Sequence, residues 1–399
     1  MNNINSKKNI SYNVWFYFTM LYLFFEFTRI HDLLGIGFVK PFFIIIGVLL
    51  FFIICNVKIN IILNKNLLKI LLFVILLCVL IPFSHNERYA FNIFFGMLVL
   101  LPGIISIVML VDSKIRIIQT SWVLVFIVFF LSVYAITHAG RGPGGIVGDE
   151  NDLALTLVTI MPCVLFLVAT CNNKFVKILL LLVFCIGILA LLSTSSRGGF
   201  LGFIAMLSGY LIFSNNKFKT LMFLAFVVLF LFFLIDSKFY NEILSITDTT
   251  ESTSQERIQS WKAGWNMFID NPLGVGGGNF AIHFPSYQSD LFSRNMWGRQ
   301  AHSIWFTLLP ETGVIGSLFF CSILFNNIKY INMIKKKFIK QKCEDALFSK
   351  NLSVAFCSSL LGYLVSASFL SVLYYPHFWI VTAFITASSS IYKAEISNI

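Results

Sequence analysis

Long runs of apolar residues, separated by short polar breaks, recur along most of the chain. A helix that crosses a bilayer needs roughly 20 mostly apolar residues. Twelve such runs are present, near residues 11–29, 38–57, 67–83, 91–111, 117–137, 152–170, 178–194, 199–213, 220–236, 303–325, 352–372 and 377–392. The pattern predicts an all-α, polytopic membrane protein, with about 12 transmembrane helices in a single integral membrane domain over residues 1–399.

Composition supports this class. Hydrophobic residues make up 58% of the chain and charged residues only 12%, against about 25% charged in soluble domains. The net charge of +11 would suggest nucleic acid as the partner of a soluble protein. In a membrane protein it records orientation, because cytoplasmic loops collect Lys and Arg. We therefore predict contact with membrane lipids and no nucleic-acid partner.

The distribution of charged residues also predicts which ends of the spans face the cytoplasm. With Lys7 and Lys8 inside and twelve spans, both termini lie in the cytoplasm. The inner segments then hold 19 of the 29 Lys and Arg residues and four acids, a net charge of +15, and the outer side carries −4. This split fits a multi-pass membrane protein with both termini on the cytoplasmic side.

The distribution of Arg and His residues departs from the rule that positive charge collects on the cytoplasmic side. Of 21 Lys residues 18 fall inside, whereas seven of eight Arg and all six His fall on or near the outer side. Guanidinium groups suit phosphate or carboxylate, and His is a proton acceptor near neutral pH. Pairing with outer acids at the interface is the simpler explanation for Arg29 and Arg88.

Two segments between spans are long. Residues 237–301 form the large periplasmic loop, and residues 326–350 form a basic cytoplasmic loop. None of the eight Cys lies in the large loop and no CxxC pair is present, so we predict no disulfide framework and no cysteine metal site.

The large loop contains a predicted helix over residues 257–269, after a capping sequence at 252–256. Arg257, Trp261 and Trp265 share one face, which fits a helix at the membrane interface. The glycine-rich segment 270–280 follows. It is either a phosphate cradle or a plain turn, since no strand precedes it and no GK[ST] follows.

Polar residues also mark shorter segments. Asp149, Glu150 and Asp152 beside Asn151 could cap the sixth span, bind a divalent metal, or contact an acceptor or sugar; we favour the cap. Arg197 lies in a break between two apolar runs, where a charge normally faces a polar cavity.

Two titratable residues mark the tenth span. His302 opens this span and is either a general base or an interfacial hydrogen-bonding residue. Glu311 lies at least one turn inside the membrane, so we expect it to be paired or to face a cavity.

Four motifs in order resemble the O-antigen ligase/polymerase superfamily, which includes lipopolysaccharide O-antigen ligases, O-unit polymerases and protein O-oligosaccharyltransferases. The resemblance runs from about Arg141 to Gly316. The motifs are GDENDLAL, STSSRGGFLG, RIQSWKAGWNMFIDNPLGVGGGNF and AHSIWFTLLPETGVIG. Many members have His-Asn where this chain has His302-Ser303, which blurs the subgroup.

The resemblance implies a glycosyltransferase C-like membrane enzyme. It would lie in the bacterial inner membrane and transfer a glycan from an undecaprenyl-diphosphate carrier to a hydroxyl acceptor such as lipid A–core. The transfer would take place on the periplasmic side, with inversion and without metal or other cofactor. Arg197, Arg257 and His302 match the family's catalytic residues. Substrate contacts are expected from Arg141, Arg294, Arg299, Asn151 and Glu311.

Two alternatives remain open. Within the family, a polysaccharide polymerase or a protein O-oligosaccharyltransferase differs only in its acceptor. A glycolipid or small-molecule transporter is the alternative of another class, because twelve spans and broken helices are common there. The chain shows no internal repeat, which favours the enzyme.

Overall fold

A computed structural model describes residues 2–57, 59–214, 216–234, 252–290, 292, 296–340 and 344–397. Over these residues the secondary structure is helical and contains no strand. The helices are α1 (Asn2–Thr28), α2 (Ile30–Leu33), α3 (Pro41–Asn56), α4 (Ile59–Ile62), α5 (Lys65–Leu80), α6 (Glu87–Leu110), α7 (Lys114–Thr137), α8 (Glu150–Ile160), α9 (Pro162–Thr170), α10 (Lys174–Ser193), α11 (Arg197–Phe213), α12 (Lys217–Leu234), α14 (Ser252–Asp270), α15 (Phe280–Tyr287), α16 (Ile304–Lys340), α17 (Glu344–Ala367) and α18 (Pro376–Ser397), with 3-10 turns at Gly37–Val39, Ile81–Phe83 and Gly145–Val147.

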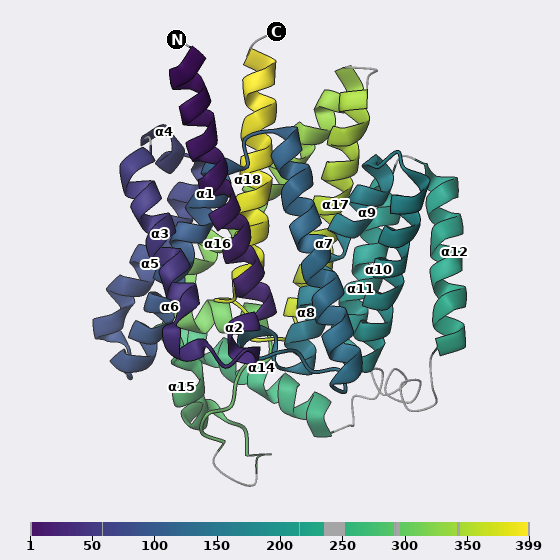
Figure 1. The fold of residues 1–399 in the computed structure, drawn as a ribbon. Coiled ribbons are helices and arrows are strands. Elements are labelled where there is room, and N and C mark those ends of the chain that lie inside the picture. Colours follow the sequence, from purple (N-terminus) through teal and green to yellow (C-terminus); the bar gives the residue numbers. More distant parts are fainter. Residues whose placement is uncertain are drawn as a thin grey trace.

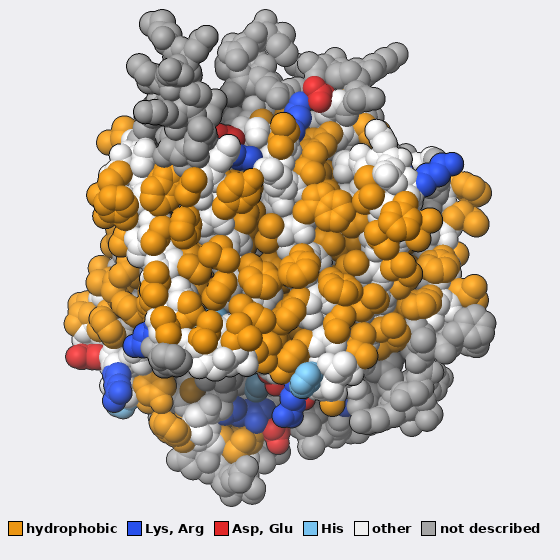
Figure 2. Space-filling model, in the orientation of Figure 1, with side chains coloured by type: hydrophobic (Ala, Val, Ile, Leu, Met, Phe, Trp, Pro, Cys, Tyr) orange, Lys and Arg blue, Asp and Glu red, His pale blue; other side chains and the backbone are white. Residues whose placement is uncertain are grey.

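The long helices lie side by side in one bundle (Figure 1). Both ends of the chain lie at one end of the bundle, and α14 and α15 lie at the opposite end, which we call the outer end. α14 runs across the bundle there instead of along it. Figure 2 shows a broad apolar band around the middle of the face in view, with charged side chains toward the two ends.

Most of the described residues of each of the twelve predicted apolar runs lie on a helix or a pair of helices. Among the described residues, six helical segments are long and apolar enough to cross a membrane: Lys65–Phe83, Glu87–Leu110, Lys114–Thr137, Glu150–Thr170, Lys174–Ser193 and Ile304–Lys335. The chain is therefore an all-α, polytopic membrane protein. The number of spans, twelve, stays a prediction.

Polar breaks between the apolar runs act as helix caps. The side chains of Asn86, Ser113, Asn173 and Ser196 accept hydrogen bonds from the first backbone N–H groups of α6, α7, α10 and α11. These N–H groups have no partner within their own helix. The breaks therefore set where each helix begins as well as separating the apolar runs.

Small residues bring α11 and α17 close together. A Cβ at Gly202 would overlap the Ser366 hydroxyl, and one at Gly209 would lie 2.9 Å from Leu361. Close backbone approach through small residues is the usual way helices associate in a membrane. The contact brings the beginning of α11 beside the end of α17, where the candidate site is built.

Three predictions about segment ends differ from the structure. The predicted cytoplasmic loop 326–350 is helical over 326–340 and 344–350, because α16 continues to Lys340. The predicted capping segment 252–256 already belongs to α14. The predicted span 352–372 ends early, because α17 stops at Ala367.

Candidate functional site

A cavity of about 710 Å³ opens at the outer end of the bundle. Its described walls come from α6, α8, α15, α16 and the loops beside them. They include Tyr89, Ile93, Asp149, Asn151, Asp152, Gly278, Ala281, Ile282, Trp297, Gly298, Gln300, His302, Thr307, Glu311, Leu370, Ser371, Val372, Tyr374 and Tyr375. Three predicted site residues, Asn151, His302 and Glu311, are therefore brought to one cavity from positions 160 residues apart in the chain.

His302 lies in the cavity wall just before α16 and is held through its backbone. Its amide donates a hydrogen bond to Ser371 Oγ at 2.9 Å. The preceding carbonyl, of Ala301, accepts one from Trp261 Nε1 at 3.1 Å. His302 has a φ of 47°, a left-handed conformation that costs energy for a residue other than glycine. These two contacts hold the strained backbone of His302 at the wall of the cavity.

The surroundings of His302 favour its neutral form. Burial lowers the pKa of the His302 imidazole below its ordinary value, since a charged ring is poorly solvated there. The guanidinium groups of Arg257 and Arg299 lower this pKa further, and Asp149 opposes them with a smaller effect. A neutral imidazole near pH 7 is able to accept a proton.

Arg257 and Arg197 approach the site from two helices that meet at one aromatic ring. Arg257 lies one turn before Trp261 on α14, and Trp261 lies 6.5 Å from Phe369 between ring centroids. Arg197 begins α11, and a Cβ at the next residue, Gly198, would lie 3.2 Å from Phe369. Both helices therefore reach Phe369, the residue before the lining residue Leu370, and neither arginine is part of the described lining.

The three acidic residues at the beginning of α8, Asp149, Glu150 and Asp152, each have a different partner. Asp149 caps α8, since its Oδ1 accepts from the Asn151 amide at 2.9 Å. The Asn151 side chain accepts from Ser196 Oγ at 2.7 Å, which ties α8 to the residue before Arg197. The cap interpretation is therefore confirmed for Asp149.

The other two acids have partners of their own. Glu150 pairs with Arg141 at 2.8 Å, and this pair raises the pKa of the exposed Arg141. Asp152 Oδ2 accepts from Tyr375 Oη at 3.2 Å. No group of three or more His, Cys, Asp or Glu side chains able to hold a metal occurs within the described part of the chain.

Two further arginines were predicted to contact substrate. Arg299 donates to Glu256 at 2.8 Å and to Ser260 at 2.7 Å, both on α14. It thus joins the segment before His302 to the helix that carries Arg257. Arg294 lies outside the described residues.

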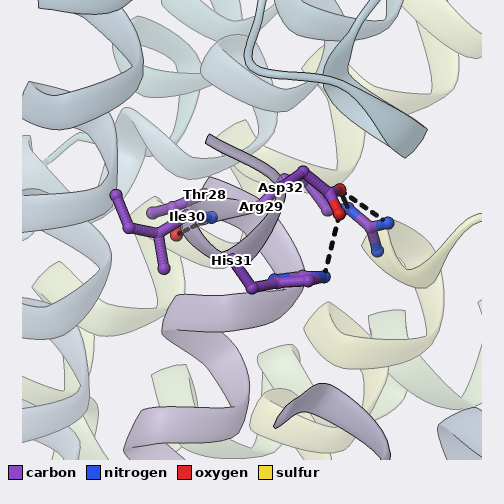
Figure 3. Close-up of polar contacts among 5 residues, drawn as sticks. All are labelled: Thr28, Arg29, Ile30, His31 and Asp32. Carbon is purple, nitrogen blue, oxygen red and sulfur yellow. Dashed lines mark hydrogen bonds and ion pairs between the residues drawn. The ribbon is translucent and has the colours of Figure 1, made fainter. Parts of the chain in front are cut away.

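The Arg29 side chain lies against Gly145, in the loop between α7 and α8 that also contains Arg141. A Cβ at Gly145 would approach the Arg29 guanidinium to 2.7 Å. Arg29 forms an ion pair with Asp32 at 2.9 Å, and His31 lies on the other side of the same carboxylate (Figure 3). The predicted pairing of Arg29 with an acid is confirmed, with Asp32 as its partner.

Glu311 is buried and holds the glycine-rich loop. Its carboxylate accepts hydrogen bonds from the Gly278 amide at 2.9 Å and the Phe280 amide at 3.2 Å, and from Tyr374 Oη at 2.7 Å. The two backbone N–H groups that a phosphate cradle would offer to a ligand thus bind a carboxylate of the protein itself. The glycine-rich segment is therefore a turn held by Glu311. Of the two interpretations open from the sequence, a phosphate cradle or a plain turn, the structure supports the turn.

The same loop breaks α16. Gly313 has a φ of 63°, and a Cβ there would overlap Leu273. The Val275 amide donates to the Pro310 carbonyl at 2.8 Å, and the Val314 amide donates to the Pro272 carbonyl at 2.9 Å. Glycine is therefore required at position 313, where the helix bends and the loop lies against its backbone.

Removing the Glu311 carboxylate is expected to destabilise this loop. In a Glu311→Ala variant one buried donor, the Phe280 amide, and two part-buried donors, the Gly278 amide and the Tyr374 hydroxyl, lose their acceptor, at up to about 1–3 kcal/mol each. The midpoint of thermal unfolding of the detergent-solubilised protein measures the loss. A Tyr374→Phe variant, which removes one of the three bonds, should lose about a third as much; equal midpoints for the two variants would contradict the role given to Glu311.

Sequence reasoning missed the loop between α17 and α18, residues 368–375, which we call the site loop. Ser371 contacts the His302 amide, Tyr374 contacts Glu311, and Tyr375 contacts Asp152. Ser368 accepts from Trp305 Nε1 at 2.9 Å. The signal that could have revealed it is Pro376, because a proline disfavours helix in the residue before it.

Comparison with known protein families gives a match over a segment that contains three of the predicted site residues. Residues 180–321 match the family model described as O-antigen ligase. The match contains Arg197, Arg257 and His302, whereas Asn151 and the site loop lie outside it. The resemblance inferred from the motifs is thereby confirmed, and an activity of the O-antigen ligase or polymerase type is indicated. No curated protein matches the chain.

Proposed function

We propose, from this O-antigen ligase-like segment over residues 180–321, that the protein transfers a glycan from an undecaprenyl-diphosphate carrier to a hydroxyl acceptor, lipid A–core. The reaction takes place at the outer end of the bundle, on the periplasmic side of the bacterial inner membrane. It inverts the anomeric carbon and uses no metal. The observation that carries the proposal is the position of His302 in the cavity wall, with Arg257 close enough to lower its pKa.

The chemistry follows from the leaving group. As the glycosidic bond breaks, negative charge grows on the bridging oxygen of the lipid diphosphate. Arg197 and Arg257 stabilise that charge as bidentate donors in a poorly hydrated site. The neutral His302 imidazole takes the proton of the acceptor hydroxyl, whose oxygen attacks the anomeric carbon from the opposite face.

The remaining residues arrange the site. Arg141, Arg294 and Arg299 steer the anionic carrier toward it. Arg299 also fixes the α14 helix through Glu256. The Asn151 side chain accepts a hydrogen bond from Ser196 and so keeps the beginning of α11 beside the cavity.

Purified protein supplied with undecaprenyl-diphosphate glycan and different acceptors tests this function. The expected product is glycan on lipid A–core. A product on a second lipid-linked glycan, or on a protein Ser or Thr, would reassign the enzyme to polymerase or O-oligosaccharyltransferase. No covalent product with any acceptor, together with movement of glycolipid across vesicles, would replace the enzyme by a transporter.

Sidedness is tested with introduced cysteines. Asp270→Cys at the end of α14 reports on the outer end. Lys174→Cys at the beginning of α10 reports on the other. In intact cells an impermeant thiol reagent should modify Asp270→Cys and leave Lys174→Cys unmodified, and the reverse pattern would overturn the topology. A chain without native cysteines provides the background for both.

A further inference from the structure

Lysines from different helices gather at the end of the bundle opposite the cavity. α11 begins beside the site and runs through the bundle, so it finishes at the end that holds both chain termini (Figure 1). The Lys335 ammonium, on α16, lies 5.5 Å from the centroid of the Phe213 ring, the last residue of α11. Lys217, which begins α12, donates to the Leu211 carbonyl at 2.6 Å and also to the Ile212 carbonyl. Two ammonium groups therefore lie at the end of one helix.

The packing of α11 against α17 brings a third lysine to the same place. A Cβ at Gly202 would overlap the Ser366 hydroxyl, and one at Gly209 would lie 3.2 Å from the Ser358 Cα. Later residues of α11 thus meet earlier residues of α17, and the two helices are antiparallel. Lys350, near the beginning of α17, therefore lies close to the end of α11.

Positive charge accumulates where these three lysines meet. Burial lowers the pKa of the Lys350 ammonium, and the neighbouring ammonium groups of Lys335 and Lys217 lower it further, as like charges do. Among the described residues, Lys217 and Lys335 contact only uncharged groups, two carbonyls and an aromatic ring. By contrast, Lys114 at the same end forms an ion pair with Asp345 at 3.0 Å. Lys217, Lys335 and Lys350, which we call the lysine cluster, concentrate charge that a bound anion would offset.

An apolar surface adjoins the lysine cluster. Phe218, Leu221 and Met222 in the first turns of α12, and Ile212 at the end of α11, are all more than half exposed. α12 lies at the edge of the bundle (Figure 1), where such an exposed apolar surface is expected to meet lipid. Positive charge beside an apolar surface suits a molecule with an anionic head and acyl chains. A soluble anion would use the charge alone.

We propose that the lysine cluster binds the phosphate of an anionic phospholipid, whose acyl chains lie along the exposed apolar side chains of α12. Basic pockets between membrane helices on the cytoplasmic side bind acidic lipid head groups, and the predicted topology places the cluster on that side. The lipid ties α12 to α16 and α17, since its phosphate meets lysines from all three helices. The site lies at the opposite end of the bundle from the cavity and does not depend on the proposed reaction.

Lipid binding to the full-length protein, purified in detergent, tests the proposal. Native mass spectrometry should show phosphatidylglycerol retained in preference to phosphatidylcholine, which carries the same phosphate and no net charge. Lys217→Gln, Lys335→Gln and Lys350→Gln should each weaken this binding about fivefold, the contribution of one lysine beside an anionic lipid. Phosphatidylglycerol should also raise the midpoint of thermal unfolding, since it binds the folded state, and inorganic phosphate at the same concentration should not.

The matched control is Lys174→Gln, which removes the same charge from an exposed lysine at the same end of the bundle. It should bind phosphatidylglycerol like the unmodified protein. Unfolding midpoints without added lipid report whether each variant is folded, and Met, which keeps the apolar stem, replaces Gln at any position where it is not. Equal weakening in Lys174→Gln and in the cluster variants would indicate diffuse attraction to a basic surface and overturn the site. Equal retention of phosphatidylcholine, or an equal rise in the midpoint with inorganic phosphate, would overturn the assignment to an anionic lipid.

Discussion

Replacing His302 by alanine is expected to lower the rate of glycan transfer by about 10²–10⁴-fold, the usual contribution of a general base. The variant should remain folded, because the contacts that hold this position, to Ser371 and through Ala301 to Trp261, are made by the backbone. Single-turnover transfer from a lipid-diphosphate glycan measures the effect, since it isolates the chemical step from product release.

The pH profile adds an independent check on His302. Since burial and the neighbouring arginines lower the pKa of His302, the neutral, active form persists to a pH below the ordinary value of about 6.5. Activity should fall only as the pH drops through that lowered pKa. A His138→Ala variant should keep both the rate and the profile. Full activity in His302→Ala would remove the base assignment.

Alanine at Arg257 or at Arg197 is expected to reduce transfer by about 10²–10³-fold, the loss seen when one donor to a developing negative charge is removed. Lysine at either position keeps the charge and loses the bidentate geometry, so it should restore little of the rate. Arg88→Ala, at an exposed outer position that is not itself part of the described cavity lining, is the matched control. An undiminished rate in Arg257→Ala would exclude that residue from the chemistry.

The two arginines should differ in their effect on His302. Arg257 is one of the cations that lower the pKa of that imidazole, so Arg257→Ala should move the acid limb of the pH profile to higher pH. Arg257→Lys keeps the cation and should leave the limb in place while the rate stays low. Arg197→Ala should lower the rate without moving the limb. Identical shifts in both alanine variants would contradict the arrangement around His302.

The helices could be predicted from the sequence because apolar length decides them. In this chain almost every apolar run of about 20 residues forms a helix, since a backbone without water must bond to itself. The polar breaks were informative as well: Asp149 and Ser196 act as helix caps. The ends at residues 340 and 367 were not predicted, because a helix that continues into a basic segment or stops within an apolar one leaves hydropathy almost unchanged.

The chemistry of the site was predictable by residue type and only partly by arrangement. A histidine before a span and an arginine in a helix break are local signals, and His302 and Arg197 were found in that way. The partner of the glycine-rich loop, Glu311, is 31 residues beyond Phe280, and nothing local indicates that the two meet. The site loop has an apolar composition that merges with the preceding span, so its contacts with Asp152 and Glu311 became evident only in three dimensions.

The site loop has a consequence for the order in which the protein matures. Residues 368–375 contact α8, α14 and α16, which all precede them in the sequence and are therefore synthesised earlier. A nascent chain that has inserted residues 180–321 already contains Arg197, Arg257 and His302. It still lacks Ser371, whose hydroxyl accepts a hydrogen bond from the His302 amide, and Tyr374, which donates one to Glu311. On the proposed function, the wall of the cavity is complete only once residues 368–375 have been synthesised, so a chain that stops before them is expected not to consume the lipid carrier.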